Sequence, residues 1–272
     1  MPNSVNTNVG ALVALQNLNA TNSELQQVQS RINTGKKVAS AKDNGAIFAI
    51  AQNQRATSNA LNAVKSSLER NQSAVEVAIS AGETISDVLL QLKEKALAAR
   101  DSGLDANSRT ALNDEYASLL GQITKAVVNA EFNGSNLIKQ AGTTIKAIAN
   151  ADATSIITVQ AQTLTLAALS IDTTSLGNTN VASTAIAAVN LAITEVSSKL
   201  SAFGTGAKAL ANHLTFVGKL QDTIDAGVGN LVDADLAKES ARLQALQTKQ
   251  QLGVQALSIA NQSSSILLGL FR

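Results

Sequence analysis

Few residues in this 272-residue chain have the types and spacing that catalysis or metal binding requires. Its one histidine is His213, and the absence of cysteine excludes disulfides, thiolate zinc ligands and cysteine nucleophiles. A protein zinc site needs three or four side-chain ligands, and no second histidine or cysteine can join His213. No glycine-rich phosphate-binding loop occurs. We therefore predict no catalytic residue, no metal site and no cofactor-binding residue.

The charged residues do not indicate a nucleic-acid or membrane partner either. The formal net charge is +1, which implies no long-range attraction to nucleic acid or to an acidic membrane. Five early basic residues form a local patch that is typical of a solvated turn: Arg31, Lys36, Lys37, Lys42 and Arg55. Asp233 and Asp235 flank Ala234, and this pair either stabilises a helix N-terminus or forms a salt bridge to a neighbouring subunit.

The composition favours long helices. Apolar residues make up 45% of the chain but aromatic residues only 2%, and the single proline, Pro2, interrupts no helix. From 46 to 99 the apolar residues recur in steps of three and four, which predicts a helix much longer than the globular average. A break at 102–108 offers Asp105 or Asn107 as the cap of a second helix, which ends near 132–134 and should return antiparallel.

The middle of the chain changes character and is followed by a strict seam. Residues 143–149 and 155–166, separated by a turn-like NADA, predict a β-hairpin with an irregular continuation. A seven-residue apolar repeat then predicts a long supercoiled helix that packs along the helix of residues 46–99. Residues 225–230 are the expected joint after it. The predicted seam residues are Ile186, Val189, Ile193, Val196, Leu200, Phe203, Leu210, Leu214 and Val217.

Both ends of the chain read as amphipathic helices, which must bury their apolar stripes against each other and against neighbouring copies. The uncharged stretch 250–271 is too polar for a membrane span, and the N-terminus lacks the basic flank and apolar run of a secretory signal peptide. The predicted polymerisation residues are Leu12, Leu15, Leu18, Leu25, Val28, Ile32, Leu236, Leu243, Leu246, Leu257, Ala260 and Leu267.

These elements predict a mainly α fold, an elongated coiled-coil rod with a small central β-hairpin region, which polymerises into a helical tube. We expect an inner coiled-coil domain with connectors from 1–45 and 226–272. A helical rod domain comprises 46–141 and 185–225, and a short, surface-facing central region comprises 142–184.

Several segments, in the right order, resemble bacterial flagellins. RINTGKKVASAKDNGA (Arg31–Ala46) is similar to the flagellin connector, and NTNVGALVALQNLNATN is similar to the flagellin N-terminus. EFNG (Glu131–Gly134) and the hairpin after it occupy the expected place, and VDADLAKES (Val232–Ser240) and LSIANQSSSILLGLF (Leu257–Phe271) resemble the C-terminal helix. Because little chain separates the two halves, the resemblance is to the short alphaproteobacterial type.

The resemblance implies the structural subunit of the flagellar filament, without enzymatic activity and without membrane insertion. Such a subunit is exported unfolded by the type III flagellar apparatus, without a cleaved signal peptide, and transmits motor torque outside the cell. Implied partners are further copies, paralogous flagellins, the filament cap and hook–filament junction proteins, and an export chaperone on the C-terminal helix.

The resemblance bears on two further properties. The segment bound by the toll-like flagellin receptor corresponds to QLKEKALA (Gln91–Ala98), where Gln91 replaces an arginine although Lys93 and Glu94 fit, which implies weak or absent recognition. The Ser/Thr-rich centre is either a polar β-surface or, as in some flagellins, a site of O-glycosylation. The candidates are Thr154, Ser155, Thr173, Thr174, Ser175, Thr179 and Ser183.

Two alternative functions fit parts of the sequence. The hook–filament junction protein shares similar termini but should not match the connector and C-terminus so fully. A secreted effector or enzyme with flagellin-like termini would need a catalytic insert, and the stretch 142–184 contains only three charged residues and no histidine.

Overall fold

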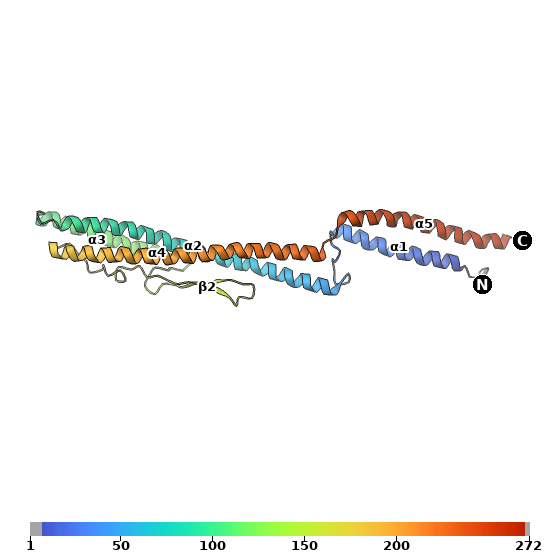
Figure 1. Ribbon diagram of the computed structural model, residues 1–272, viewed down its shortest axis with the longest axis horizontal. Coiled ribbons are helices and arrows are strands. Elements are labelled where there is room, and N and C mark those ends of the chain that lie inside the picture. Colours follow the sequence, from blue (N-terminus) through green and yellow to red (C-terminus); the bar gives the residue numbers. More distant parts are fainter. Residues whose placement is uncertain (1–6, 270–272) are drawn as a thin grey trace. The chain divides into compact units, whose positions relative to one another are not determined.

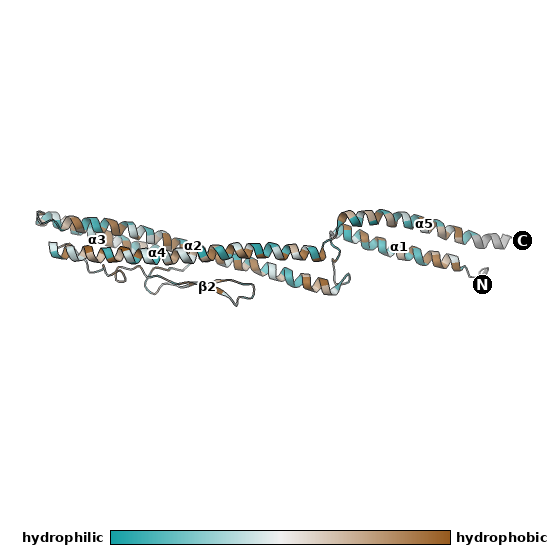
Figure 2. Cartoon of the chain, viewed as in Figure 1, coloured by the Kyte–Doolittle hydropathy of each residue, from teal (hydrophilic) through white to brown (hydrophobic). Residues whose placement is uncertain are grey.

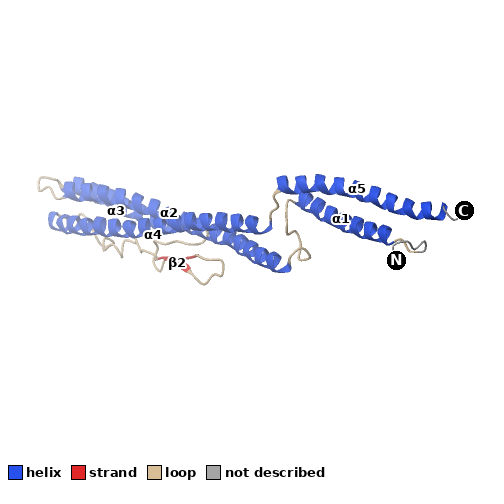
Figure 3. Cartoon of the chain, turned by 45° about the vertical axis from the view of Figure 1, so that its right-hand side comes forward, coloured by secondary structure: helices blue, strands red, loops and turns tan. Residues whose placement is uncertain are grey.

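The computed structural model describes residues 7–269, with side chains described for residues 7–262. This part of the chain contains five helices and a two-stranded antiparallel sheet (Figure 1). In chain order these elements are α1 (Val9–Thr34), α2 (Gly45–Ala99), α3 (Ala106–Asn129), β1 (Ile145–Ile148), β2 (Ile156–Val159), α4 (Thr179–Val232) and α5 (Leu236–Gly269). The predicted mainly α fold with one small central β-hairpin is confirmed (Figure 3).

The chain divides into two compact units. Unit 1 comprises residues 1–56 and 223–272, and unit 2 comprises residues 57–222. Helices α2 and α4 each contribute residues to both units.

In unit 2, α2 carries two series of buried apolar side chains at seven-residue spacing, the first interrupted by Gly82 and the second by the half-buried Asn71. One series places Leu61, Leu68, Val75, Leu89 and Ala96 at 2% exposure or less. The other contains Val64, Ala78, Ile85, Leu92 and Ala99. Two such series define a coiled-coil face, which accounts for a helix of 55 residues. Helix α3 begins where the sequence predicts, since Asp105 accepts a hydrogen bond from Ser108 N at 2.8 Å, and it buries one face centred on Tyr116 and Ile123.

The hairpin is short, and it is fastened to both long helices. Ile145 pairs with Val159 and Ile148 with Ile156. The Ile148 N–H donates to Ser67 Oγ on α2 at 3.3 Å, and His213 Nε2 on α4 lies 2.7 Å from Ala149 O. The predicted strands extended further, to 143–149 and 155–166.

The stretch 142–184 is predicted to face the surface, but part of it is buried. Leu164, Leu169, Ile171 and Leu176 lack any helical or strand periodicity, yet each is at most 1% exposed. The backbone N–H groups of Gln162 and Leu164 donate to Leu137 O and Ile138 O, which holds this irregular segment in the core. Helix α4 also begins at Thr179, earlier than predicted, because Asn178 Oδ1 caps it by accepting from Val181 N at 2.9 Å.

The predicted joint at 225–230 is wrong, because α4 continues to Val232. In unit 1, Val228 and Val232 pack with Val38 and Ala51 in a small apolar cluster. This burial keeps the segment helical despite Gly227 and Gly229, so the break falls at 233–235.

A compact connector links α1 to α2 in unit 1. Helix α1 ends at Gly35, whose φ of 68° is left-handed and suits glycine. The N–H groups of Lys37 and Val38 both donate to Val232 O, at 2.8 and 3.2 Å, and Ala234 N donates to Gly35 O at 2.9 Å. The connector therefore lies against the break between α4 and α5.

Candidate assembly interface

Helices α1 and α5 lie side by side in unit 1 and run antiparallel (Figure 1). Leu25, Val28 and Leu246 are the buried centre of their contact, and the half-buried Ile32 and Leu243 pack against it. Gly253 provides room for Leu18, since a Cβ at this glycine would lie 3.3 Å from Leu18 Cδ1.

Polar contacts fasten this pair of helices along its length. Asn8 Nδ2 donates to Ala260 O, and Gln250 Nε2 donates to Asn22 Oδ1, both at 2.7 Å. Toward the connector, Arg31 and Glu239 form an ion pair with 3.1 Å between Nη1 and Oε1. A looser pair, Arg242–Glu24 at 3.7 Å, is exposed, and such surface pairs contribute little stability.

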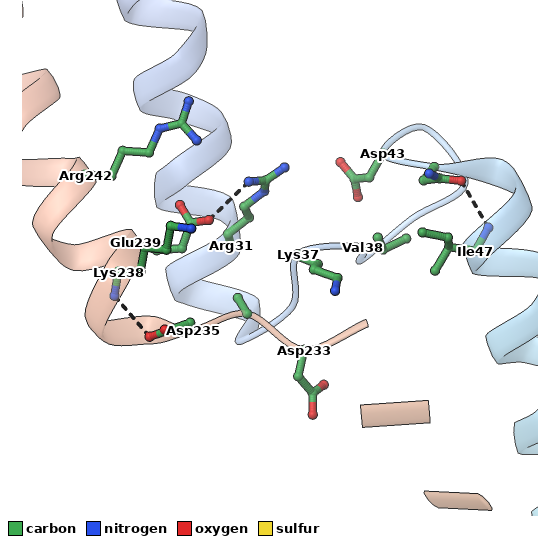
Figure 4. Close-up of a pocket in the computed structure, with 12 residues that line it drawn as sticks. Arg31, Lys37, Val38, Asp43, Ile47, Asp233, Asp235, Lys238, Glu239 and Arg242 are labelled. Carbon is green, nitrogen blue, oxygen red and sulfur yellow. Dashed lines mark hydrogen bonds and ion pairs between the residues drawn. The ribbon is translucent and has the colours of Figure 1, made fainter. Parts of the chain in front are cut away.

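A hollow of about 510 Å³ lies beside the Arg31–Glu239 pair, between the connector and the first turns of α5 (Figure 4). Its lining contains equal numbers of basic and acidic residues: Arg31, Lys37, Lys238 and Arg242, and Asp43, Asp233, Asp235 and Glu239. The described residues contain no group of three His, Cys, Asp or Glu side chains placed to hold a metal ion.

Two acidic residues of the hollow, Asp43 and Asp235, accept hydrogen bonds from nearby backbone N–H groups. Asp43 Oδ2 accepts hydrogen bonds from Ser40 N at 2.9 Å and Ala39 N at 3.0 Å. The hydrogen bond from the Ser40 backbone is the main reason that the pKa of Asp43 lies below its usual value. The Asp233/Asp235 pair divides: Asp235 Oδ1 accepts from Lys238 N at the start of α5, whereas Asp233 forms a backbone β-bridge with Lys36.

Apolar residues occur along both α1 and α5 (Figure 2), and many of their side chains remain exposed after the two helices pair. Up to residue 262, the exposed large apolar side chains of the two helices are Val9, Leu12, Val13, Leu15, Leu236, Leu252, Val254 and Ile259, each at least 43% exposed. Two apolar hollows of about 420 Å³ each lie along the pair, one beside Leu18 and Leu252 and the other beside Leu15 and Leu257.

The predicted polymerisation residues therefore fall into distinct groups. Leu25, Val28 and Leu246 are buried within the chain, and Leu18, Ile32, Leu243, Leu257 and Ala260 are half-buried. Leu12, Leu15 and Leu236 are exposed, while the side chain of Leu267 lies outside the described residues. Val13, Leu252, Val254 and Ile259 are not among the predicted residues, because they lie off the stripe that faces the partner helix inside the chain.

The predicted seam of α4 is only partly buried in unit 2. Val189, Val196, Phe203, Leu210 and Val217, spaced seven residues apart, are at most 1% exposed. Ile186, Ile193, Leu200 and Leu214 are half-buried. By length and apolar composition alone α4 is also long and apolar enough to span a membrane, although the residues of this series are buried within the fold.

The Ser and Thr candidates for O-glycosylation differ in the exposure of their side chains. Thr154, Ser155, Thr173, Ser175 and Ser183 are exposed, and Thr179 is half-buried. The Thr174 hydroxyl is engaged, because its Oγ1 lies 2.9 Å from Tyr116 Oη and donates to Ile171 O at 2.6 Å. The single histidine contacts Ala149 O and lies beside Phe216, with 5.7 Å between ring centroids.

Comparisons with known proteins agree with this arrangement. Residues 5–143 match the family model of the bacterial flagellin N-terminal helical region, and residues 186–271 match that of the C-terminal helical region. Flagellin FljM of Caulobacter vibrioides is 59% identical over 271 residues, which cover 99% of both chains. A flagellin of Brucella melitensis is 36% identical, again with 99% of each chain covered.

A solved structure supports the fold. The crystal structure of Bacillus cereus flagellin superposes with a TM-score of 0.51 at 21% identity, covering 54% of this chain and 86% of that one. None of these comparisons supports the junction-protein or effector alternatives. The chain belongs to the bacterial flagellin family, in its alphaproteobacterial type, and is a structural subunit of the extracellular flagellar filament.

Proposed function

We propose that this subunit assembles through the outer faces of α1 and α5, which pack against the same helices of neighbouring copies around a central channel. The observation that carries the proposal is the row of exposed apolar side chains left after α1 and α5 pair within one chain. Contiguous apolar surface of this kind marks an interface in soluble proteins.

The energetic argument depends on how few side chains the intrachain pair buries. Among the side chains that the structure describes on α1 and α5, three large apolar residues, Leu25, Val28 and Leu246, are buried in the α1–α5 contact, whereas eight remain exposed. Full burial of one leucine or isoleucine contributes about 1.5–3 kcal/mol. Covering even a few of these residues with neighbouring copies would stabilise a polymer strongly.

The test is seeded elongation of filaments from purified subunits, followed by electron microscopy and sedimentation. Leu12→Gln or Ile259→Gln should raise the subunit concentration needed for elongation about tenfold or more, given the leucine value above. Gln16→Ala, at an exposed polar position of α1, is the matched control and should elongate like the wild type.

Truncation provides a second arm of the test. A chain lacking residues 253–272 loses the half of α5 that contains Leu257 and Ile259, so it should remain monomeric while unit 2 keeps its fold. Elongation by the truncated chain, or unchanged elongation by both glutamine variants, would refute assembly through these helices.

We further propose that the chain is exported unfolded through the type III flagellar apparatus without cleavage of a signal peptide. In this proposal an export chaperone binds α5 before export. The filament cap and the hook–filament junction proteins contact the two ends of the polymer, and paralogous flagellins join the same filament. The assembled tube transmits motor torque. The intact mass of subunits from native filaments should correspond to a chain that begins at Met1 or Pro2.

Weak or absent recognition by the toll-like flagellin receptor is the corresponding proposal for unit 2. Gln91, Lys93 and Glu94 are exposed on α2, so the glutamine is available where strong agonists present an arginine. Gln91→Arg should increase receptor signalling in reporter cells above that of the wild type, while Lys93→Arg serves as a charge-preserving control. Equal signalling by Gln91→Arg and the wild type would contradict the assignment.

O-glycosylation of the Ser/Thr-rich centre also remains a proposal. The exposed side chains of Ser155, Thr173, Ser175 and Ser183 support it better than Thr174, whose hydroxyl is engaged with Tyr116. Thr154 is exposed too, but its Oγ1 accepts a hydrogen bond from Asn150 Nδ2 at 2.7 Å. Peptide mass spectrometry of native filaments should place any glycan on the exposed group.

A further inference from the structure

Helices α1 and α5 pair along one continuous seam. Up to residue 262, the residues of α5 that are not exposed alternate in steps of four and three: Glu239, Leu243, Leu246, Gln250, Gly253, Leu257 and Ala260. The same alternation on α1 runs through Ala11, Ala14, Leu18, Thr21, Leu25, Val28 and Ile32. This is the spacing of a coiled coil, and in an antiparallel pair it leaves two flanks, one on each side of the seam.

The exposed apolar side chains next to the seam divide between these two flanks. Consecutive residues of a helix are about 100° apart, so the residues just before and just after a seam position lie on opposite sides of it. The exposed apolar residues that immediately precede seam positions form one flank, the Ile259 flank: Val13, Leu252 and Ile259. Those that immediately follow seam positions form the other, the Leu15 flank: Leu12, Leu15 and Val254.

Each flank also contains one of the two apolar hollows of about 420 Å³. The hollow of the Ile259 flank is lined by residues that precede the seam, among them Asn17, Lys249, Leu252 and Ala256. The hollow of the Leu15 flank is lined by residues that follow it, among them Leu12, Leu15 and Asn261. The linings therefore agree with the division of the apolar side chains.

At two levels along the pair, one flank is hollowed where the other projects. Gly253 lines the hollow of the Ile259 flank, and its neighbour Val254 projects from the Leu15 flank. Asn8, which lines the hollow of the Leu15 flank, donates to Ala260 O, and the adjacent Ile259 projects from the opposite flank. Each flank is thus complementary to the other flank and not to itself.

We propose that the Ile259 flank of each copy packs on the Leu15 flank of the next copy. Ile259 then enters the hollow of the neighbour's Leu15 flank, while Val254 of that neighbour enters the hollow of the Ile259 flank. A second copy is the occupant because the two complementary surfaces occur on one chain, and both insertions form together because each hollow lies level with the side chain on the opposite flank. A contact between two different surfaces of one chain is heterologous and, when it does not close into a ring, builds an open helical polymer. This pairing of flanks presupposes the proposed assembly through α1 and α5, and it specifies which surfaces meet.

Disulfide cross-linking within filaments tests this pairing, because the full-length chain has no cysteine of its own. The single-cysteine variants are Ile259→Cys and Ala256→Cys on the Ile259 flank, and Leu15→Cys and Val254→Cys on the Leu15 flank, all at exposed positions. Two variants at a time are copolymerised with wild-type subunits on seeds, oxidised and resolved by non-reducing gel electrophoresis. Only cysteines whose Cα atoms come within about 7 Å of each other can form a disulfide.

The pairs that join different flanks, Ile259→Cys with Leu15→Cys and Ala256→Cys with Val254→Cys, should each give a two-chain product that is lost when the filaments are depolymerised before oxidation. The pairs within one flank, Ile259→Cys with Ala256→Cys and Leu15→Cys with Val254→Cys, are the matched controls and should give none. A two-chain product from the same-flank pairs, or none from the pairs that join different flanks in filaments containing both variants, would overturn the pairing. Leu12→Gln and Ile259→Gln separate this failure from that of the proposed function, because unchanged elongation by both would refute assembly through α1 and α5 itself.

Discussion

At the scale of single residues, the Asn136 side chain forms hydrogen bonds through both atoms of its amide. It is fully buried, its Nδ2 donates to Val127 O at 2.7 Å, and its Oδ1 accepts from Ile138 N and Lys139 N at 2.9 Å each. These bonds tie the end of α3 to the segment that enters the hairpin.

Asn136→Ala should therefore destabilise the subunit by about 3 kcal/mol or more, because each buried group left without a partner costs about 1–3 kcal/mol. Urea unfolding of the monomer, followed by circular dichroism, measures this loss. Asn129→Ala, at an exposed position near the end of α3, is the control and should stay within about 0.5 kcal/mol of the wild type. Equal effects of the two substitutions would contradict the role assigned to Asn136.

A second residue-scale prediction concerns pH. The hydrogen bond from the Ser108 backbone N–H is the main cause that lowers the pKa of Asp105 from its usual 3.8. A lowered folded-state pKa means that the ionised cap adds stability above pH 3.8, and this contribution is lost as the pH falls through the lowered value.

The prediction is measured by comparing thermal unfolding of the wild type and Asp105→Asn between about pH 6 and about pH 2.5. Asparagine still caps the helix but cannot ionise. The wild type should unfold at the higher temperature near neutral pH, and the difference should disappear at the acid end. A difference that stays constant across this range would exclude Asp105 as the titrating cap.

At the scale of elements, the docking of the hairpin on α4 depends on Gly206. A Cβ at this position would lie 2.8 Å from Val159 Cγ1 and 3.0 Å from Cγ2, and the β-branched valine has little freedom to move aside. Gly218, on the same helix, has open space where a Cβ would be placed.

The two glycines should therefore respond oppositely to alanine. Gly218→Ala should stabilise the subunit by about 0.5–1 kcal/mol, because glycine is the poorer helix former. Gly206→Ala should destabilise it despite the same gain, and adding Val159→Ala should recover part of the loss. Urea unfolding of the three variants measures this, and stabilisation by Gly206→Ala would show that the hairpin does not pack closely on α4.

The elements that could be predicted from the sequence are those whose burial is periodic. The apolar spacing of α2 and α4 and the cap at Asp105 are visible in the amino-acid sequence. Residues 164–176 could not be placed, because the burial of Leu164, Leu169 and Ile171 follows an irregular backbone that has no period. The glycines near the end of α4 suggested a joint, yet Ile224, Val228 and Val232 continue in steps of four and keep the segment helical.

The assembly residues were only partly predictable for a related reason. A helical stripe shows that a face is buried, but it does not show which copy buries it. Leu25 and Leu12 belong to the same predicted stripe, yet Leu25 is 9% exposed and Leu12 is 58% exposed. Side chains off the stripe, such as Ile259, become candidates only when the partner helix within the chain is known.

At the scale of the whole molecule, the two units differ in how much they bury. Unit 2 contains most of the fully buried large side chains, including Tyr116, Phe203 and Leu89. In unit 1 the α1–α5 pair has one small cluster around Val28, and the connector region has a second around Val232. Segments with few buried apolar contacts open at low free-energy cost.

Hydrogen exchange should therefore distinguish the units in the free subunit. Amides of α1 and α5 should exchange much faster than those in the buried faces of α3 and of α2 within unit 2, because opening the α1–α5 pair exposes only a few large side chains. In the filament the same amides should become protected, since neighbouring copies cover the exposed faces of both helices. The Leu12→Gln variant, measured as a monomer, should keep the wild-type pattern, because its side chain is already exposed. Equal protection of α1, α5 and unit 2 in the free subunit would mean that the intrachain pair is stable by itself and that assembly is not needed to order it.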